Sequence, residues 1–139
     1  MIIVDTNVVA ELMRPEPNEV VRRWSLALRS DESFTTAITL AEILYGIERL
    51  PSGRRKDLLR TTAAEVFATF GDRVLPFDAD AAAHYALIVG GRDRLGRPID
   101  GFDAQIASIC RVGRAALATR NVSHFEHTGI ELIDPWHAR

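Results

Sequence analysis

The sequence has few of the features that mark secreted or membrane proteins. Its 139 residues include one cysteine, Cys110, so no disulfide can form within the chain. No run approaches the ~20 apolar residues that span a bilayer. The first residues also lack the basic stretch and apolar segment of a signal peptide. We therefore expect a cytoplasmic protein with no membrane segment, whose single thiol is a buried core residue rather than a nucleophile.

Lysine is also scarce. The chain has one lysine, Lys56, and sixteen arginines, and its net charge is −2. A chain with this charge lacks the broad basic surface of many nucleic-acid-binding proteins, which argues against tight non-specific binding. Arginine nevertheless binds phosphate well through its planar guanidinium group. Candidate residues for attracting a phosphate backbone are Arg92, Arg94 and Arg97, although the same three could simply form a solvated loop.

Length and composition indicate a single domain. A chain of 139 residues fits one domain, here residues 1–139. Hydrophobic residues make up 47% and charged residues 26%, as in ordinary globular proteins. A chain of this length buries enough surface to fold without a disulfide or a structural metal.

Short apolar stretches alternate with amphipathic ones along the chain, which predicts an α/β fold. We expect a small, mainly parallel sheet of about five strands flanked by helices. The expected strands are 34–37, 74–77, 115–118, 130–133 and the N-terminal 2–4. The expected helices are 6–13, one capped by Asn18, 40–50, 54–70, one from Asp78 or Asp80 to about Val89, and 100–112. The order of the strands cannot be read from the sequence.

Three acids and an asparagine stand where expected strands and helices meet. Asp5 ends the first strand, Glu42 follows the second, Asp103 lies early in the helix before the fourth, and Asn121 follows the fourth. Ligand sites in parallel sheets gather at the carboxyl ends of the strands. Acids that converge there repel one another, and a divalent cation relieves that repulsion. Magnesium and manganese prefer such oxygen ligands.

Zinc is a poorer match to this pattern, because zinc sites contain histidine or cysteine. The chain has four histidines, and only His124 and His127 have a spacing that resembles a metal pair. They lie in a short polar segment near the C-terminus. We interpret this segment as a surface feature.

Each acid also has a purely structural interpretation. Asp5 could cap the helix that follows it. Thr39-x-x-Glu42 has the pattern of a capping box, in which the glutamate bonds to the amide at the start of the helix. The helix dipole could stabilise the negative charges of Asp100 and Asp103 at the start of the expected helix 100–112. For Asp100, as for Asp78 and Asp80, capping is the preferred interpretation.

Four characteristic segments follow one another along the chain: Ile-Ile-Val-Asp5-Thr6-Asn7-Val8, Ala41-Glu42-Ile43-x-x-Gly46-Ile47, Asp103-Ala104-Gln105-Ile106-Ala107 and Ala118-Thr119-Arg120-Asn121. In this order they resemble the PIN-domain ribonucleases, and more closely the VapC toxins of bacterial toxin–antitoxin pairs, especially their FitB-like branch. The resemblance covers essentially the whole chain, including Ile133-Asp134-Pro135-Trp136.

The resemblance implies a PIN-like fold that hydrolyses RNA phosphodiester bonds with Mg²⁺, for which Mn²⁺ could substitute. It implies that Asp5, Glu42 and Asp103 bind the metal and, with Asn121, form the catalytic set. Asn121 stands where many members have a fourth acid, which puts a second metal ion in doubt. Thr6 and Thr119 resemble the family's pocket hydroxyls, but they could equally serve as cap and strand-end hydrogen-bonding groups.

The resemblance also implies partners: a cognate VapB-like antitoxin, the RNA substrate and a second copy of the chain, with a larger toxin–antitoxin assembly possible. Two other functions remain open. One is a different metal-dependent phosphohydrolase, although the Asp-x-Asp motif of aspartyl phosphatases is absent because residue 7 is Asn. The other is a non-catalytic, metal-free binding module whose acids only cap helices or bind an arginine-bearing peptide.

Overall fold

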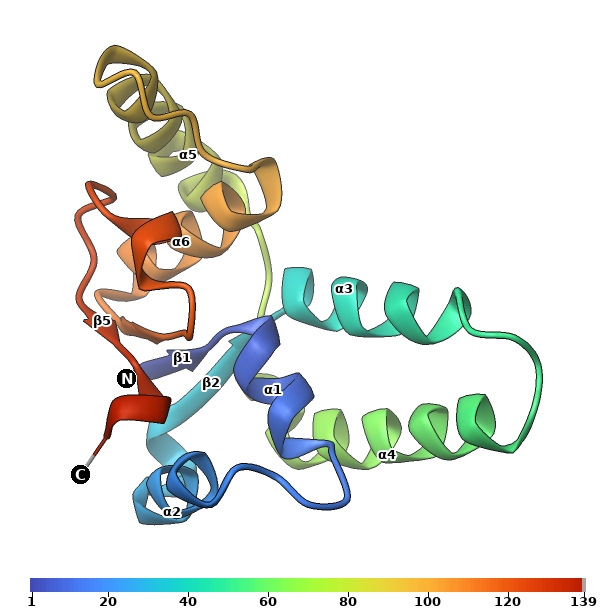
Figure 1. Ribbon diagram of the computed structural model, residues 1–139. Coiled ribbons are helices and arrows are strands. Elements are labelled where there is room, and N and C mark those ends of the chain that lie inside the picture. Colours follow the sequence, from blue (N-terminus) through green and yellow to red (C-terminus); the bar gives the residue numbers. More distant parts are fainter. Residues whose placement is uncertain (139) are drawn as a thin grey trace.

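Five parallel strands form one sheet at the centre of the computed structural model, which describes residues 1–138 (Figure 1). The strand order is β3-β2-β1-β4-β5, and every neighbouring pair is parallel. This confirms the expected fold class. The strands are β1 (Ile2–Val4), β2 (Ser33–Thr36), β3 (Val74–Leu75), β4 (Ala116–Ala118) and β5 (Leu132–Ile133).

Residues 1–138 contain six α-helices around the sheet and four short 3₁₀ turns. Turns η1 and η2 each join a helix to a strand, η3 joins β4 to β5, and η4 follows β5. The helices are α1 (Thr6–Leu12), α2 (Glu19–Ala27), α3 (Ala37–Glu48), α4 (Arg54–Phe70), α5 (Ala79–Arg94) and α6 (Gly101–Gly113). The turns are η1 (Ser30–Glu32), η2 (Gly71–Arg73), η3 (Val122–Phe125) and η4 (Pro135–His137).

Alternate residues of the central strands point to opposite faces of the sheet, as strand geometry requires. Ile3 of β1 pairs with Leu117 of β4. Both belong to a core cluster with Ile88 of α5 and Ile106 of α6. Cys110 belongs to the same cluster and is fully buried, and this burial raises the pKa of its thiol. One face of the sheet is therefore covered by α5 and α6, and the expectation for Cys110 is confirmed.

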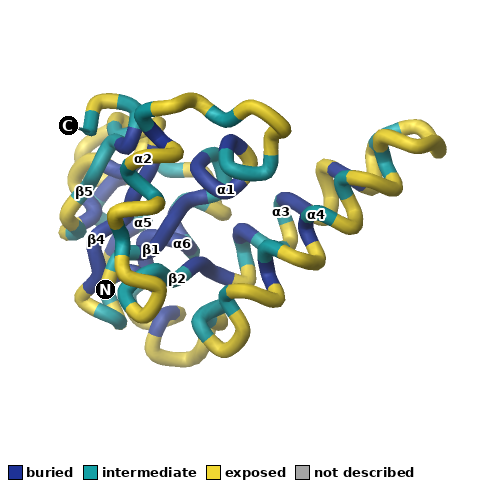
Figure 2. The backbone as a smooth tube through the Cα atoms, turned by 90° about the horizontal axis from the view of Figure 1, so that it is seen from below, coloured by how far each residue is buried: buried dark blue, intermediate teal, exposed yellow. Residues whose placement is uncertain are grey.

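The other face carries the next residues along, Val4 and Ala118, which are also paired across the two strands. They pack with Val8 of α1, Ile43 of α3 and Phe67 of α4. The helices α3 and α4 form a hairpin that extends beyond the body of the molecule and is exposed at its tip (Figures 1 and 2). None of the helices in residues 1–138 is both long and apolar enough to cross a membrane.

Helix α3 begins earlier than the sequence predicts. Thr36 ends β2 and caps α3, and its Oγ1 accepts a hydrogen bond of 3.0 Å from the backbone N of Thr39. The predicted capping box of Thr39 and Glu42 is therefore wrong, because Thr39 already lies in the first turn of the helix. Glu42 lies in the second turn, where its side chain is free to contact another element.

Helix α5 continues through Gly90 and Gly91 to Arg94, whereas the sequence suggested an end near Val89. A glycine within a helix costs only about 1 kcal/mol relative to alanine. The extensive packing of α5 against α6 offsets this cost. As a consequence, Arg92 belongs to the last turn of a helix and not to a loop.

Candidate functional site

Asp5 lies at the junction of β1 and α1, at the carboxyl edge of the sheet. Its backbone N continues the β-ladder to Ala118 O at 2.9 Å, while its side-chain Oδ1 accepts a 2.8 Å hydrogen bond from Thr6 N. Asp5 is thus the N-cap of α1, as the structural interpretation proposed. It is also only 4% exposed. Burial of a charge is costly unless it is well solvated by the protein, so further partners are required.

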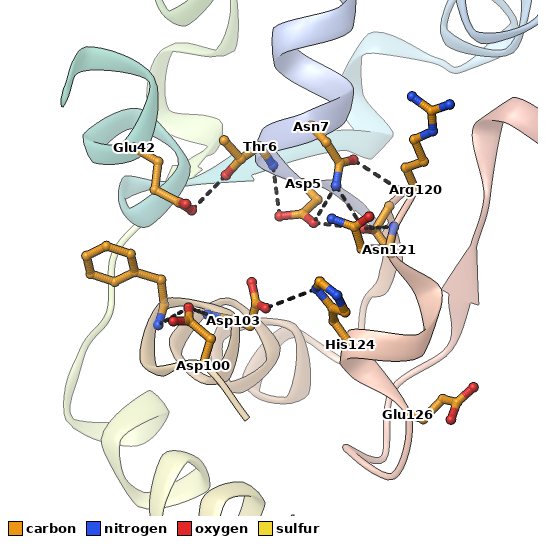
Figure 3. A network of polar contacts seen from close by, with 12 residues as sticks. Asp5, Thr6, Asn7, Glu42, Asp100, Asp103, Arg120, Asn121, His124 and Glu126 are labelled. Atoms are coloured by element: carbon orange, nitrogen blue, oxygen red, sulfur yellow. Dashed lines mark hydrogen bonds and ion pairs between the residues drawn. The ribbon is translucent and has the colours of Figure 1, made fainter. Parts of the chain in front are cut away.

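Two side chains from α1 and the end of β4 provide these partners. Thr119 Oγ1 donates a 2.8 Å hydrogen bond to Asp5 Oδ2, and Asn7 Nδ2 donates to the same oxygen at 3.3 Å. Thr119 Oγ1 in turn accepts from Asn7 Nδ2 and from the backbone N of Asn121. Asn7 Oδ1 accepts from the backbone N of Arg120. The network joins α1 to the end of β4 around one carboxylate (Figure 3).

Glu42 reaches the same region from α3. Its Oε1 accepts a 2.9 Å hydrogen bond from Thr6 Oγ1, which also lies 3.1 Å from Thr39 Oγ1. Thr6 follows Asp5 directly, so this contact brings Glu42 to the side of Asp5. Figure 3 shows both carboxylates at the rim of one open space. The hydroxyls of Thr6 and Thr119 both bond to acids here, which is more than the cap or strand-end role that the sequence left open.

Asp103 faces these two acids from the first turn of α6 (Figure 3). Asp100 is the N-cap of α6, and its Oδ2 accepts hydrogen bonds from the backbone N of Phe102 at 3.0 Å and of Asp103 at 3.3 Å. Capping by Asp100 is therefore confirmed. On its other side, Asp103 Oδ2 lies 3.7 Å from Nδ1 of His124, whose side chain is 58% exposed.

The electrostatic coupling of the acids shows that they share one space. Burial raises the pKa of Asp5, and the hydrogen bonds from Thr119 and Thr6 only partly oppose this effect. Burial also raises the pKa of Glu42, with further repulsion from Asp5 and Asp100. The pKa of Asp103 rises to about 6 through burial and repulsion by Asp5 and Asp100. Carboxyl groups with raised pKa values in one depression are typical of functional sites.

The donor atoms of this site fit a hard divalent cation, because nearly all are carboxylate, hydroxyl or amide oxygens. Asn121 follows Thr119 and Arg120 after β4, and its side chain lies beside Asp5 in Figure 3. Within residues 1–138, however, no three histidine, cysteine, aspartate or glutamate side chains converge closely enough to bind one ion together. An ion bound here would therefore need water as well as protein ligands.

The structure assembles all four expected site residues, Asp5, Glu42, Asp103 and Asn121, at one edge of the sheet. His124 also lies beside Asp103, and because both His124 and His127 are exposed, the expectation of a surface segment is confirmed. Nothing local in the sequence shows that the turn carrying His124 folds back over α6.

Asn7 also belongs to the site, although sequence reasoning used it only as a residue of the first motif and as evidence against an Asp-x-Asp pattern. The sequence signal for the role of Asn7 is its position two residues after Asp5. A side chain at that position of the first helical turn can reach back to the strand end.

The expected role of Arg92 in attracting RNA is wrong. Its side chain is buried, at 6% exposure, and it donates to backbone carbonyls instead of facing solvent. Arg94 and Arg97 are exposed, and Arg97 Nη1 lies 3.5 Å from Glu126 Oε2.

We predict that Thr119→Val destabilises the protein by about 1–3 kcal/mol. The substitution removes the Thr119 hydroxyl, and a buried polar group that is left without its hydrogen-bond partner costs free energy. Valine keeps the shape of threonine, but it leaves Asp5 Oδ2 with a single donor and the backbone N of Asn121 with none. Urea denaturation at pH 7 measures the effect. Thr119→Ser retains the hydroxyl and serves as the control, so equal losses in the two variants would contradict the hydrogen-bond explanation.

Comparisons with known proteins agree with this geometry. A family profile described as "PIN domain" matches residues 2–130. VapC ribonuclease Y4jK of Sinorhizobium fredii is 36% identical over 98% of both chains, and Toxin FitB of Neisseria gonorrhoeae is 35% identical over 99% of both. A solved structure of FitAB bound to the IR36 DNA fragment superposes with a TM-score of 0.94 and 34% identity, covering 100% of this chain and 98% of that one. The chain therefore belongs to the PIN-domain family.

Proposed function

We propose that this chain is a Mg²⁺-dependent endoribonuclease and the toxic component of a VapBC-type toxin–antitoxin pair. The observation that carries the proposal is the group of three acids, Asp5 at the β1–α1 junction, Glu42 of α3 and Asp103 of α6, which repel one another at the carboxyl edge of the sheet. PIN-domain nucleases depend on divalent metal ions. The similarity to a VapC ribonuclease supports RNA as the substrate.

Asp5 and Asp103 are the proposed direct ligands of the metal, and Glu42 either binds it or holds one of its waters. Asn121 lies where its amide can orient a water or a phosphate oxygen. When bound, Mg²⁺ lowers the pKa of a coordinated water and stabilises negative charge on the phosphate. Mn²⁺ has similar ligand preferences and is expected to substitute. Because residue 121 is an asparagine and not an acid, the site has one fewer negative charge with which to bind a second ion.

The residues around the acids fix where these ligands point. Asp5 Oδ2 is occupied by Thr119 and Asn7, whereas Oδ1 accepts one hydrogen bond, from Thr6, and keeps a free lone pair. Glu42 is held through Oε1 by the same threonine. His124 is exposed beside Asp103, where its imidazole can donate to a phosphate oxygen of the RNA. In the overall reaction, the water oxygen bonds to phosphorus, one P–O bond of the backbone breaks, and the leaving oxygen takes up a proton.

The proposed antitoxin partner has a groove available next to the site. A depression of about 490 Å³ lies between α1, α3 and α4 and is lined by apolar residues such as Met13, Ile47 and Leu59. Glu42 forms part of the same lining. A peptide segment bound along this groove would reach the acids and block them. The DNA-bound FitAB complex is a toxin–antitoxin complex, which supports a partner of this kind.

A second copy of the chain is also proposed, in line with the expected homodimer. Large apolar side chains remain exposed on α3 and α6, namely Leu44, Tyr45 and Phe102. We further propose that residues 1–139 form one domain, because β5 and Trp136 pack into the same fold beyond the segment matched by the family profile. We also propose a cytoplasmic location, because the proposed substrate is cellular RNA.

The function is tested by incubating the purified chain with RNA and Mg²⁺, Mn²⁺ or EDTA. We expect cleavage with either ion, none with EDTA, and a large loss in Asp103→Asn. Asp72→Asn changes an exposed acid next to β3, away from the site, and should cleave as the wild type does. Cleavage that persists in EDTA would contradict the proposal, as would a phosphorylated enzyme intermediate, which indicates a phosphatase.

Two further measurements address the partners and the target. Co-expression of the protein encoded beside this chain should suppress cleavage, and light scattering should give the mass of a dimer. Sequencing of RNA ends after brief induction, for the wild type and Asp103→Asn, identifies the RNA that is cut. A chain that neither binds Mg²⁺ in calorimetry nor cleaves RNA would be the metal-free binding module.

A further inference from the structure

Arg92 is a buried cation that forms no ion pair within residues 1–138. It lies in the last turn of α5 and is 6% exposed. Arginine is almost never buried to this extent unless its charge is compensated. The nearby Arg97 has a carboxylate partner in Glu126, but the guanidinium of Arg92 bonds only to backbone carbonyls. Because burial of this charge costs free energy, the role of Arg92 is to be found in the backbone segments that its hydrogen bonds connect.

The carbonyls bound by Arg92 belong to two separate segments. Nε donates to Arg97 O at 2.6 Å, in the connection between α5 and α6. Nη1 donates to His124 O and Glu126 O, each at 2.9 Å, in η3 and directly after it. One rigid, planar group thus joins two stretches of chain that are about 30 residues apart in sequence.

These two segments form the walls on either side of Asp103. The first leads directly into Asp100 and the N-terminal turn of α6, which carries Asp103. The second carries His124, whose Nδ1 lies 3.7 Å from Asp103 Oδ2 (Figure 3). Phe125, next to His124, packs in the core with Ile106 and Cys110 of α6, but no hydrogen bond within residues 1–138 joins the backbones of His124 and Asp103. Arg92 supplies hydrogen bonds that link the backbone at His124 to the segment before α6.

The charge of Arg92 is not among the causes that shift the pKa values of the three acids. Burial and the neighbouring acids raise the pKa of Asp103, and the nearby His124 lowers it. The contribution of Arg92 is consequently geometric, through the backbone atoms that it holds.

We propose that Arg92 is a positioning residue of the nuclease site, which binds the backbone on both sides of Asp103 and so keeps His124 facing that carboxylate. The proposal rests on the proposed ribonuclease function for its catalytic consequence, but its structural part stands independently. The last turn of α5, which follows Gly90 and Gly91, places Arg92 between the two segments.

The test uses Arg92→Lys and Arg92→Met in the full chain. Lysine keeps the positive charge, but its single amine cannot replace a guanidinium that bonds through two different nitrogens. We expect faster amide hydrogen exchange in residues 95–100 and 121–127 of both variants. We also expect kcat for RNA cleavage to fall on the order of 100-fold with KM nearly unchanged, as displacement of a catalytic group by about 1 Å does.

Arg73 supplies a matched control, because its guanidinium also bonds to three backbone carbonyls, those of Ser30, Ser33 and Thr69. It lies at the other side of the sheet, next to β3. Arg73→Lys should loosen residues 30–33 and leave kcat unchanged.

Wild-type hydrogen exchange and wild-type kcat in Arg92→Lys would overturn the proposal, and so would an equal loss of kcat in Arg73→Lys. If Arg92→Met fails to fold, Arg92→Lys decides alone. If the wild-type chain does not cleave RNA, the proposed function fails, and the exchange of residues 95–100 and 121–127 still tests the structural role of Arg92.

Discussion

Replacement of Asp5 by asparagine is expected to abolish metal-dependent RNA cleavage while leaving the protein folded. The substitution keeps the size of the side chain and the oxygen that caps α1 through Thr6 N. It removes one negative charge from the proposed metal site. In many metal sites, loss of a residue that only orients a ligand lowers metal affinity or activity roughly 10- to 100-fold. Loss of a direct ligand should therefore lower the cleavage rate more than ~100-fold.

The stability of Asp5→Asn separates this role from simple capping. The pKa of Asp5 is raised by burial, so the ionised group costs free energy in the metal-free protein, and a neutral amide relieves that cost. Against this, an amide NH₂ at the position of Oδ2 meets the donors of Thr119 and Asn7. These effects oppose each other, and we expect a net change within about 1 kcal/mol.

Cleavage rates normalised to the folded fraction, together with urea denaturation, measure the two effects. Asp78→Asn is the matched control, because Asp78 caps α5 through Ala81 N but lies outside the site. Full Mg²⁺-dependent cleavage by Asp5→Asn would falsify the ligand role. A change in stability alone, similar to that of Asp78→Asn, would restore the capping interpretation.

The sequence predicted the strands and most helices because their signals are local. The apolar stretch before Asp5 predicts β1, and Asn18 predicts the start of α2, and the structure confirms both. Of the two candidate caps of α5, Asp78 is the cap and Asp80 lies in the first turn of the helix. The start of α3 was missed because Thr36 and Thr39 are equally good caps by residue type. Tertiary contacts decide between them, since Glu42 is needed at Thr6 and not at the helix terminus.

The parts of the site that could not be predicted depend on contacts between distant segments. Arg92 was assigned to a solvent-facing patch because Gly90 and Gly91 suggested that α5 had already ended. In the fold, two of its partners are carbonyls in η3 and directly after it, which no local pattern links to α5. The same turn brings His124 to Asp103. The four expected site residues were recognisable because junctions between strands and helices gather at one edge of a parallel sheet, whereas His124 comes from a turn whose position depends on specific tertiary contacts.

The stability of the metal-free protein is expected to fall as the pH rises from about 4 to about 7. Asp103 has a folded-state pKa of about 6, above the value of 3.8 for an unperturbed aspartate. A carboxyl group with a raised pKa contributes its full stabilisation below the unfolded-state value and loses it as the pH rises through the folded-state value. The pKa values of Asp5 and Glu42 are raised as well, so all three acids act in the same direction.

For Asp103 alone, the shift corresponds to a loss of about 1–3 kcal/mol between pH 4 and pH 7. A divalent ion should reverse the trend, because it binds the ionised acids of the folded state and gains affinity as they lose their protons. The increase in Tm on adding Mg²⁺ should therefore be small at pH 5 and larger at pH 7.5. Asp103→Asn should show a flatter pH dependence and a smaller effect of Mg²⁺, while Asp72→Asn should match the wild type. A Mg²⁺ effect that is equal at both pH values, or unchanged in Asp103→Asn, would mean that these acids do not form the metal site, and their mutual repulsion would then need another explanation.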